Sequence, residues 1–392
     1  MTTATMQSSS IDIWSDEVLS DPYPAFTELR EQASAVFLET REVWVLTRYD
    51  AIRDALADWE SFSSTKVAFN PQMNEVLTGT TLASDPPLHT TLRAALSENL
   101  TPRALRGLKV RIDEKADRIV AELLERDSFD AVEGLARELP LQIVLDLIGV
   151  QGEVREKILG WGAAAFNLLG PMNERSEASF PLAGELFEWT HGMEGDKLAE
   201  GSIGRAIFDA GARGDIPPEL CGHIIHQYLA AGMDTTIGSI ANAIRLLGEH
   251  PEQFARLKAD PSLIPAAFNE TLRYESLMHA QGRGTTRDVE VDGTVIPAGS
   301  QVGVLLYAGN RDPRHYERPD EFRIERNPVD HLSFGYGVHG CAGQGLAKLE
   351  AHAAIEAWCR RVESYSVGTP TVKLNNTSRA LDALPVFDVV AA

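Results

Sequence analysis

The sequence predicts a mainly helical fold with a minor share of β-structure, and two observations support this prediction. An apolar run over 220–247 lies between Pro217-Pro218 and Gly248-Glu-His-Pro251. Proline before such a run and Gly or Pro behind it mark helix ends, so we expect one helix of about 30 residues here. Strand signals, in contrast, are confined to short stretches of alternating or β-branched residues.

The strands can be placed in chain order. Residues 36–38 and 43–46 flank a polar turn and predict a hairpin near the N-terminus. Residues 289–296 alternate around Asp292-Gly293, which predicts a second hairpin. A further strand is expected over 301–307.

One domain is expected to include the whole chain of 392 residues. No Pro/Ser-rich linker, low-complexity tract or internal repeat divides the sequence, so we assign 1–392 to a single domain with residues 1–20 as an N-terminal tail. With 44% hydrophobic residues, the chain has enough apolar material for a core that encloses a cofactor.

The termini and cysteines bear on location. Met1 to Ser10 is polar, and no window approaches the roughly 18 uninterrupted apolar residues of a membrane anchor, so we expect a cytoplasmic protein without a membrane partner. Cys221 and Cys359 show no pairing pattern. We expect both to be buried small side chains in a reducing compartment.

A glycine-spaced loop around Cys341 carries the clearest chemical signal. It has the sequence Phe334-Gly-Tyr-Gly-Val-His-Gly-Cys-Ala-Gly343, and a helix is expected to begin at about Gln344. Backbone N–H groups at a helix N-terminus stabilise a thiolate, which is what a haem-thiolate iron requires. A dinucleotide-binding loop would need a preceding strand that is missing here. A buried inert cysteine would not account for the surrounding Phe, Gly and His.

This loop resembles the haem-binding signature of the cytochrome P-450 family, Phe-x-x-Gly-x-His-x-Cys-x-Gly. Every position of the signature is met, by Phe334, Gly337, His339, Cys341 and Gly343. The resemblance covers essentially the whole chain and implies a single helical domain with small antiparallel sheets. It also implies haem b, with Cys341 as the axial iron ligand and Phe334, Gly335, His339 and Gly343 around the cofactor.

The activity implied by the resemblance is that of a monooxygenase, an oxidoreductase that inserts one oxygen atom of O2 into a C–H bond. Electrons would come from NAD(P)H through a reductase and an iron–sulfur ferredoxin, since the chain contains no fused redox module. We expect a monomer.

His89 and Arg93, four residues apart, share one face of a helix that the pair Pro86-Pro87 is expected to start. A His and an Arg that point the same way suit a carboxylate. The resemblance implies that both bind the haem propionates together with His339 and Arg283. Without it, they would be interpreted as surface residues.

Glu270-Thr-Leu-Arg273 places an acid and a base on one helix face. Alone, such a pair is most often a solvated salt bridge worth at most about 1 kcal/mol. The resemblance implies a structural ion-pair triad of Glu270, Arg273 and Arg326.

Asp234 and Thr235 lie in the middle of the expected long helix, where both residue types are poor helix formers. By default they would be satisfied core or surface groups. The resemblance implies instead that they deliver protons during oxygen activation, while Ala231 and Gly232 leave room beside them.

The substrate region resembles that of bacterial members that hydroxylate or O-demethylate para-substituted benzoates. By that likeness Phe166, Leu169, Ala231, Gln281 and the segment after Asn376 face the substrate. An apolar pair at helical spacing, such as Phe166 and Leu169, is otherwise usually core.

The chain departs from those members at the carboxylate grip. Their arginine and serines correspond to His226, Gln227 and Ala230 here, while Lys66 and Asn70 could supply a cation and a donor from elsewhere. A buried carboxylate without such partners costs several kcal/mol. We therefore expect O-demethylation or hydroxylation of a para-substituted (methoxy)benzoate that His226 or Lys66 binds. The alternative is a neutral methoxyphenol, terpene or similar small hydrophobic molecule.

The net charge is −21, from 36 basic and 57 acidic residues, which argues against nucleic acid or anionic membranes as partners. Segment 91–111 is an exception, with Glu98 as its single acid and the basic residues Arg93, Arg103, Arg106, Lys109 and Arg111. A charge run is usually a solvated face. The resemblance implies that this one docks a ferredoxin.

Two functions of other kinds fit the same cysteine. A haem-thiolate sensor or binding protein without turnover would not need Asp234 and Thr235, and it usually carries an output domain. A peroxide-driven peroxygenase would replace the acid and alcohol. An intact pair favours the reductase-driven monooxygenase.

Overall fold

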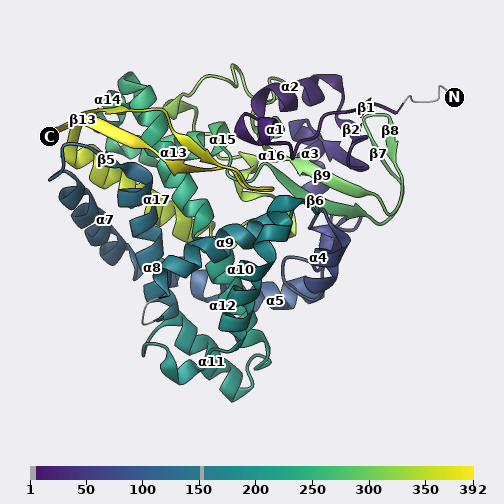
Figure 1. Ribbon diagram of the computed structural model, residues 1–392, viewed down its shortest axis with the longest axis horizontal. Helices are drawn as coiled ribbons and strands as arrows, with labels where there is room; N and C mark the ends of the chain where they lie inside the picture. Colours follow the sequence, from purple (N-terminus) through teal and green to yellow (C-terminus); the bar gives the residue numbers. More distant parts are fainter. Residues whose placement is uncertain (1–5, 151–153) are drawn as a thin grey trace.

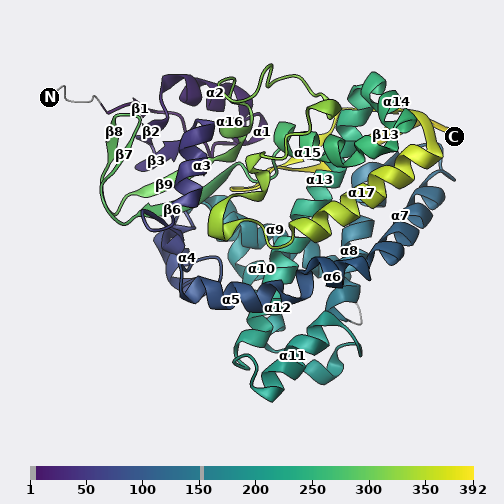
Figure 2. The ribbon, with the colours of Figure 1, turned by 180° about the vertical axis from the view of Figure 1, so that it is seen from behind.

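The computed structural model describes residues 6–150 and 154–392 (Figures 1 and 2). The α-helices are α1 (Asp16–Ser20), α2 (Tyr23–Gln32), α3 (Tyr49–Ala57), α4 (Pro71–Val76), α5 (Leu88–Ser97), α6 (Pro102–Arg106), α7 (Lys109–Leu123), α8 (Glu138–Ile148), α9 (Arg155–Leu168), α10 (Glu174–His191), α11 (Ile203–Arg213), α12 (Leu220–Gly232), α13 (Asp234–Glu249), α14 (Pro251–Ala259), α15 (Ile264–Tyr274), α16 (Leu306–Asn310) and α17 (Gln344–Arg361). The strands are β1 (Ser8–Ser9), β2 (Ala35–Leu38), β3 (Val43–Leu46), β4 (Phe62–Ser63), β5 (Phe129–Asp130), β6 (Ala280–Thr285), β7 (Val289–Val291), β8 (Thr294–Ile296), β9 (Gln301–Leu305), β10 (Val362–Val367), β11 (Thr371–Lys373), β12 (Ala380–Ala383) and β13 (Pro385–Ala391). The mainly helical fold is therefore confirmed.

Helix α13 runs through the middle of the helical part and is buried along nearly its whole length (Figure 1). It packs against α9, α15 and α17. Its sequence is apolar on all sides between Ile237 and Leu247 apart from a few polar residues, and a helix of that kind belongs in a core. The largest apolar cluster accordingly joins α7, α8, α12, α13 and α17.

The single long helix expected over 220–247 is wrong, because the structure divides it into α12 and α13 at Met233. Two hydroxyls compete with the backbone at this point. Thr235 donates to the carbonyl of Ala231 at 2.9 Å, and Thr236 donates to that of Gly232 at 3.3 Å. Such bonds bend helices, and Gly232 adds backbone freedom.

The largest sheet lies at one end of the molecule beside α1, α2 and α3, with strand order β1-β2-β3-β9-β6-β4 (Figure 1). Both expected hairpins are confirmed, β2 with β3 and β7 with β8. The strand expected over 301–307 ends at Leu305, where α16 follows. Two pairings, β1 with β2 and β3 with β9, are parallel, since long stretches of chain join these strands.

Much of the segment expected as an N-terminal tail is part of the fold. β1 pairs with β2, and α1 follows it. Ile13 and Trp14 are almost fully buried in an apolar cluster with Phe26, which gives this segment a reason to pack. Residues 1–5 lie outside the described part.

Cys221 and Cys359 are buried and unpaired, as expected. In the described ranges, no helix has both the length and the apolar character that crossing a membrane requires.

A buried ion-pair triad joins α15 to the chain before the Cys341 loop. Glu270 accepts from Arg273 through Nε and Nη2, both at 2.8 Å, and from Nε of Arg326 at 3.1 Å. The side chains of Glu270 and Arg273 are 0% exposed. Arg273 also donates to the carbonyls of Asn310 and Pro319. Because every buried charge has a partner, the triad fixes these segments against one another.

Replacing Arg273 with alanine should lower the free energy of unfolding by about 3 to 5 kcal/mol, because it leaves the Glu270 carboxylate buried with one partner fewer. Arg213→Ala, which breaks the exposed pair of Arg213 with Asp215, is the matched control and should cost less than about 1 kcal/mol. Denaturant unfolding of the two holoproteins measures both changes. Equal losses would contradict a special role of the buried triad.

Candidate active site

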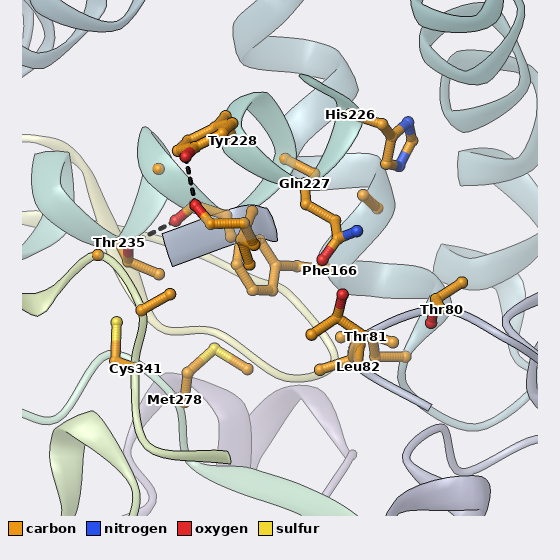
Figure 3. Close-up of a pocket in the computed structure, with 18 of the residues that line it drawn as sticks. Thr80, Thr81, Leu82, Phe166, His226, Gln227, Tyr228, Thr235, Met278 and Cys341 are labelled. Atoms are coloured by element: carbon orange, nitrogen blue, oxygen red, sulfur yellow. Dashed lines mark hydrogen bonds between the residues drawn. The ribbon is translucent and has the colours of Figure 1, made fainter. Parts of the chain in front are cut away.

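A cavity of about 670 Å³ lies in the interior, between the Cys341 loop and helices α9, α10, α12 and α13. The segment before α5, the start of β6 and the residue Thr377 complete its wall. Most of the lining is apolar. Figure 3 shows Cys341 and Thr235 toward one end of this cavity and Thr80 and His226 toward the other.

The loop before α17 presents the thiol of Cys341 to the cavity. Gly335 and Gly337 have φ of 68° and 70°, and a Cβ at Gly337 would overlap the carbonyl oxygen of Leu56. Glycine is therefore required there. The loop closes where the N–H of Cys341 donates to the carbonyl of Phe334 at 2.7 Å, and α17 begins at Gln344 as expected.

Opposing effects act on the Cys341 thiol. Burial raises its pKa, while the backbone N–H groups of Gly343 and Gln344 and the charge of Arg93 lower it. Burial dominates, so the thiol is protonated at neutral pH unless a metal binds it. A coordinated thiol is deprotonated outright, and the N–H groups then stabilise the resulting charge.

Four basic side chains gather on the Cys341 side of the cavity without an anionic partner. The rings of His89 and His339 lie 4.1 Å apart, and Nε2 of each is buried without a hydrogen bond. Arg283 is buried, and its side chain donates to the carbonyl of Gly282. Arg93 donates to Ser97 and to the carbonyl of Gly340. No ion pair joins either arginine to an acid among the described residues.

The pKa values of these groups reflect burial without compensation. Burial lowers the pKa of Arg283 to about 10, against the attraction of Asp85. Burial, Arg283 and His89 lower the pKa of His339 to about 3. Buried guanidinium groups of this kind require an anion.

These residues fit a haem. Its propionates would meet the basic groups of His89, Arg93, Arg283 and His339, which lack an anionic partner, and its iron would meet the Cys341 sulfur. Gly343 borders the cavity, and a Cβ there would meet open space. The donor set and the free space thus match one cofactor.

Asp234 and Thr235 diverge at the start of α13. Thr235 lines the cavity, whereas Asp234 lies beside Gly162 of α9 behind the wall. Burial raises the pKa of Asp234 to about 6, against the attraction of Lys373 and Arg137. A carboxyl with this pKa exchanges its proton near neutral pH.

Seven of the nine predicted substrate residues line the cavity: Phe166, Leu169, His226, Gln227, Ala230, Ala231 and Gln281. In Figure 3, Phe166 lies near the middle of the space, and Gln227 reaches toward it from α12. Thr377 shows that the segment after Asn376 also reaches the cavity.

The predictions that Lys66 and Asn70 face the substrate are wrong. Nζ of Lys66 donates to the carbonyl of Gly299, outside the cavity, because the short helix that carries Lys66 packs its side chain over Gly284 of β6. Asn70 caps α4 by accepting from the N–H of Met73, and its amide donates to the carbonyls of Leu168 and Gly170. Its polar atoms are therefore used for folding.

His226 lines the cavity but carries no charge at neutral pH. Burial, His223 and His191 lower its pKa to about 4. The free cavity therefore offers no charged imidazole to a carboxylate. Among the described lining residues, the only Lys or Arg side chains are Arg93 and Arg283, which lie on the haem side.

The sequence argument missed Thr80, Thr81, Leu82 and Met278, which line the cavity. No local motif marks them, because only the tertiary fold brings these segments to the cavity.

The cavity also has an apolar rim, defined here as Val76, Leu82, Phe180 and Phe187. All four line it, and they are 66%, 41%, 39% and 50% exposed.

The basic segment of α6 and α7 lies close to the thiol loop. A Cβ at Gly345 would meet Leu105, so α6 packs on the first turn of α17. Lys109 pairs with Asp113, and Arg111 with Asp146. Arg103 and Arg106 are exposed and make no ion pair with the described residues.

Comparisons with known proteins agree with this site. The profile described as Cytochrome P450 matches residues 222–377. Cytochrome p450 CYP199A2 of Rhodopseudomonas palustris is 35% identical over 383 residues, which cover 96% of this chain and 93% of that protein. Cytochrome P450 monooxygenase PikC of Streptomyces venezuelae is 33% identical and covers 98% of this chain and 95% of its own length.

Solved structures have the same fold. That of cytochrome P450 CREJ in complex with (4-ethylphenyl) dihydrogen phosphate superposes with a TM-score of 0.85 at 31% identity, over 94% of this chain and 97% of that chain. CYP109E1 from Bacillus megaterium in complex with testosterone gives 0.87 at 26% identity, over 96% of this chain and 100% of that chain. With a thiol loop, basic groups beside it that fit a haem and relatives of this similarity along nearly its full length, the chain belongs to the cytochrome P450 family.

Proposed function

We infer that the chain works as a P450 monooxygenase that acts on small organic substrates with haem b, O2 and electrons from redox partners. When bound, haem b with a cysteinate ligand supplies oxygen activation, in which O2, two electrons and two protons convert a C–H bond to C–OH and release water. The protein supplies the thiol of Cys341, the partners for the propionates and the substrate cavity.

We propose that the substrate is a small neutral para-substituted aromatic molecule such as a methoxyphenol, which the enzyme O-demethylates. Hydroxylation of the methoxy carbon gives a hemiacetal, which releases formaldehyde and leaves the phenol. The absence of a cation among the described lining residues on the substrate side carries this choice, because a buried carboxylate would lack a partner. The resemblance to benzoate-oxidising members and the para-substituted phenyl ligand of CREJ support an aromatic substrate.

Turnover of two matched substrates tests this proposal. Formaldehyde release from 4-methoxyphenol should exceed that from 4-methoxybenzoate by about tenfold or more at neutral pH, since only the benzoate buries an unpaired charge. Formaldehyde and NAD(P)H are measured with the reconstituted electron-transfer chain. Faster formaldehyde release from 4-methoxybenzoate would contradict the neutral substrate and favour a carboxylic acid.

The proposed proton route uses both residues at the start of α13. Asp234, with a pKa of about 6, would take protons from the solvent side, and the Thr235 hydroxyl would pass them into the cavity. This assignment rests on the exposure of Thr235 to the cavity and on the position of Asp234 directly behind it.

Thr235→Ala should bind substrate normally but release several times more hydrogen peroxide per NAD(P)H, because the last proton donor is lost. Thr235→Ser is the matched control, since it keeps the hydroxyl, and it should stay close to wild type. Product and peroxide are measured per NAD(P)H consumed. Unchanged coupling in the alanine variant would exclude this role.

We also propose that a ferredoxin docks at Arg103 and Arg106, with Arg93, Lys109 and Arg111 contributing to the field of this face. Arg103 and Arg106 have no acidic partner among the described residues, and α6 packs next to the helix that begins after Cys341. An acidic iron–sulfur protein would therefore be guided to the thiol side of the haem.

Charge reversal of Arg103 and Arg106 to glutamate should slow ferredoxin-dependent reduction several-fold at low salt, and the difference should shrink as salt rises. Arg213→Glu makes the same kind of charge change on α11 and serves as the control. Stopped-flow reduction measures both. Equal slowing in the control would mean that only net charge matters.

A further inference from the structure

Two neutral polar side chains face each other in the substrate cavity. Gln227 comes from α12 and Thr81 from the segment before α5, and both line the cavity. In Figure 3 the amide of Gln227 and the hydroxyl of Thr81 point toward one another beside Phe166. Thr81 is only 5% exposed. Within 6–150 and 154–392, no hydrogen bond is made by either side chain.

Polar groups without a hydrogen bond in an apolar cavity indicate which polar groups a ligand should have. Two other polar groups of the cavity are engaged, since Thr80 accepts from the N–H of Ala83 and Tyr228 donates to the carbonyl of Leu96. An apolar ligand would remove water from Gln227 and Thr81 without replacing its hydrogen bonds, and unpaired buried groups are unfavourable. A ligand with a matching polar group would satisfy them.

The hydrogen-bonding chemistry of the Gln227 amide and the Thr81 hydroxyl limits which ligand groups can pair with them. The amide offers N–H donors and an oxygen acceptor, and the hydroxyl donates once and accepts. Neither carries a charge. Glu188 also lines the cavity and is acidic, so an anion gains nothing from it. A hydroxyl group on the ligand, which donates and accepts, complements both side chains at once.

We propose that Gln227 and Thr81 form a hydroxyl-binding subsite that selects phenols or alcohols and positions their far end toward Cys341. This proposal rests on the proposed function, because it concerns the same cavity, and it names the polar group that the substrate carries. Gln227 and Thr81 are then positioning residues that act through the bound ligand. Phe166 would pack against the ring between them and the haem side.

Ligand pairs that differ only in the hydroxyl test the subsite. Purified ferric holoenzyme is titrated with 4-methoxyphenol and 4-methoxytoluene, and with cyclohexanol and methylcyclohexane, while the Soret band reports displacement of water and calorimetry reports binding. Wild type should bind each hydroxyl compound about tenfold more tightly than its methyl isostere. Gln227→Leu and Thr81→Val should each reduce that preference about fivefold.

Gln72→Leu is the matched control, because Gln72 is an exposed amide of α4 that does not line the cavity. It should leave the hydroxyl preference unchanged, and loss of preference in this variant would overturn the assignment. The thiolate-type Soret band of each holoenzyme verifies folding. If Thr81→Val fails to fold, Gln227→Leu alone decides.

The two ligand pairs separate this proposal from the proposed function. Variant-sensitive preference for cyclohexanol without binding of either aromatic would uphold the subsite and overturn the aromatic substrate. Binding of both pairs with a preference that the variants do not change would overturn the subsite and leave the aromatic substrate in place. Binding of no compound would overturn both.

Discussion

The fold depends on buried basic groups that the chain does not neutralise by itself. Two buried carboxylates elsewhere are paired with arginines, Glu270 with Arg273 and Glu275 with Arg245 at 2.8 Å. On the Cys341 side of the cavity, Arg283 is buried without an acid, and the neighbouring imidazoles of His89 and His339 have unpartnered nitrogens. An anionic cofactor would complete this network, so haem binding and folding would stabilise one another.

The substrate side of the cavity differs, because it has no Lys or Arg among its described lining residues. Its lining is mostly apolar with Glu188 as an acidic member, and the cations lie on the haem side or, as Lys66 does, outside the cavity. Between the two sides, Asp234 and Thr235 are adjacent residues of α13 that point in different directions. Thr235 faces the cavity, while Asp234 lies near Gly162 of α9. The first turn of α13 thus places an acid next to a residue of the hydrophobic cavity.

Sequence reasoning succeeded where the signal was local. The glycine loop, the start of α17 and both hairpins follow from turn chemistry and residue spacing. It failed where the packing of distant segments decides the outcome. Whether Lys66 faces the cavity depends on how its helix packs on β6, and the contribution of Thr81 depends on the approach of its segment to α12. The break at Met233 arises from hydroxyl bonds that compete with a strong helical pattern.

The apolar rim formed by Val76, Leu82, Phe180 and Phe187 has a thermodynamic consequence. These side chains are in contact with water in the open protein, and they surround the way into a cavity with little polar surface. Substrate entry removes water from the rim, the cavity wall and the ligand together. Burial of apolar surface gives association a negative heat-capacity change, so its enthalpy becomes more favourable as temperature rises.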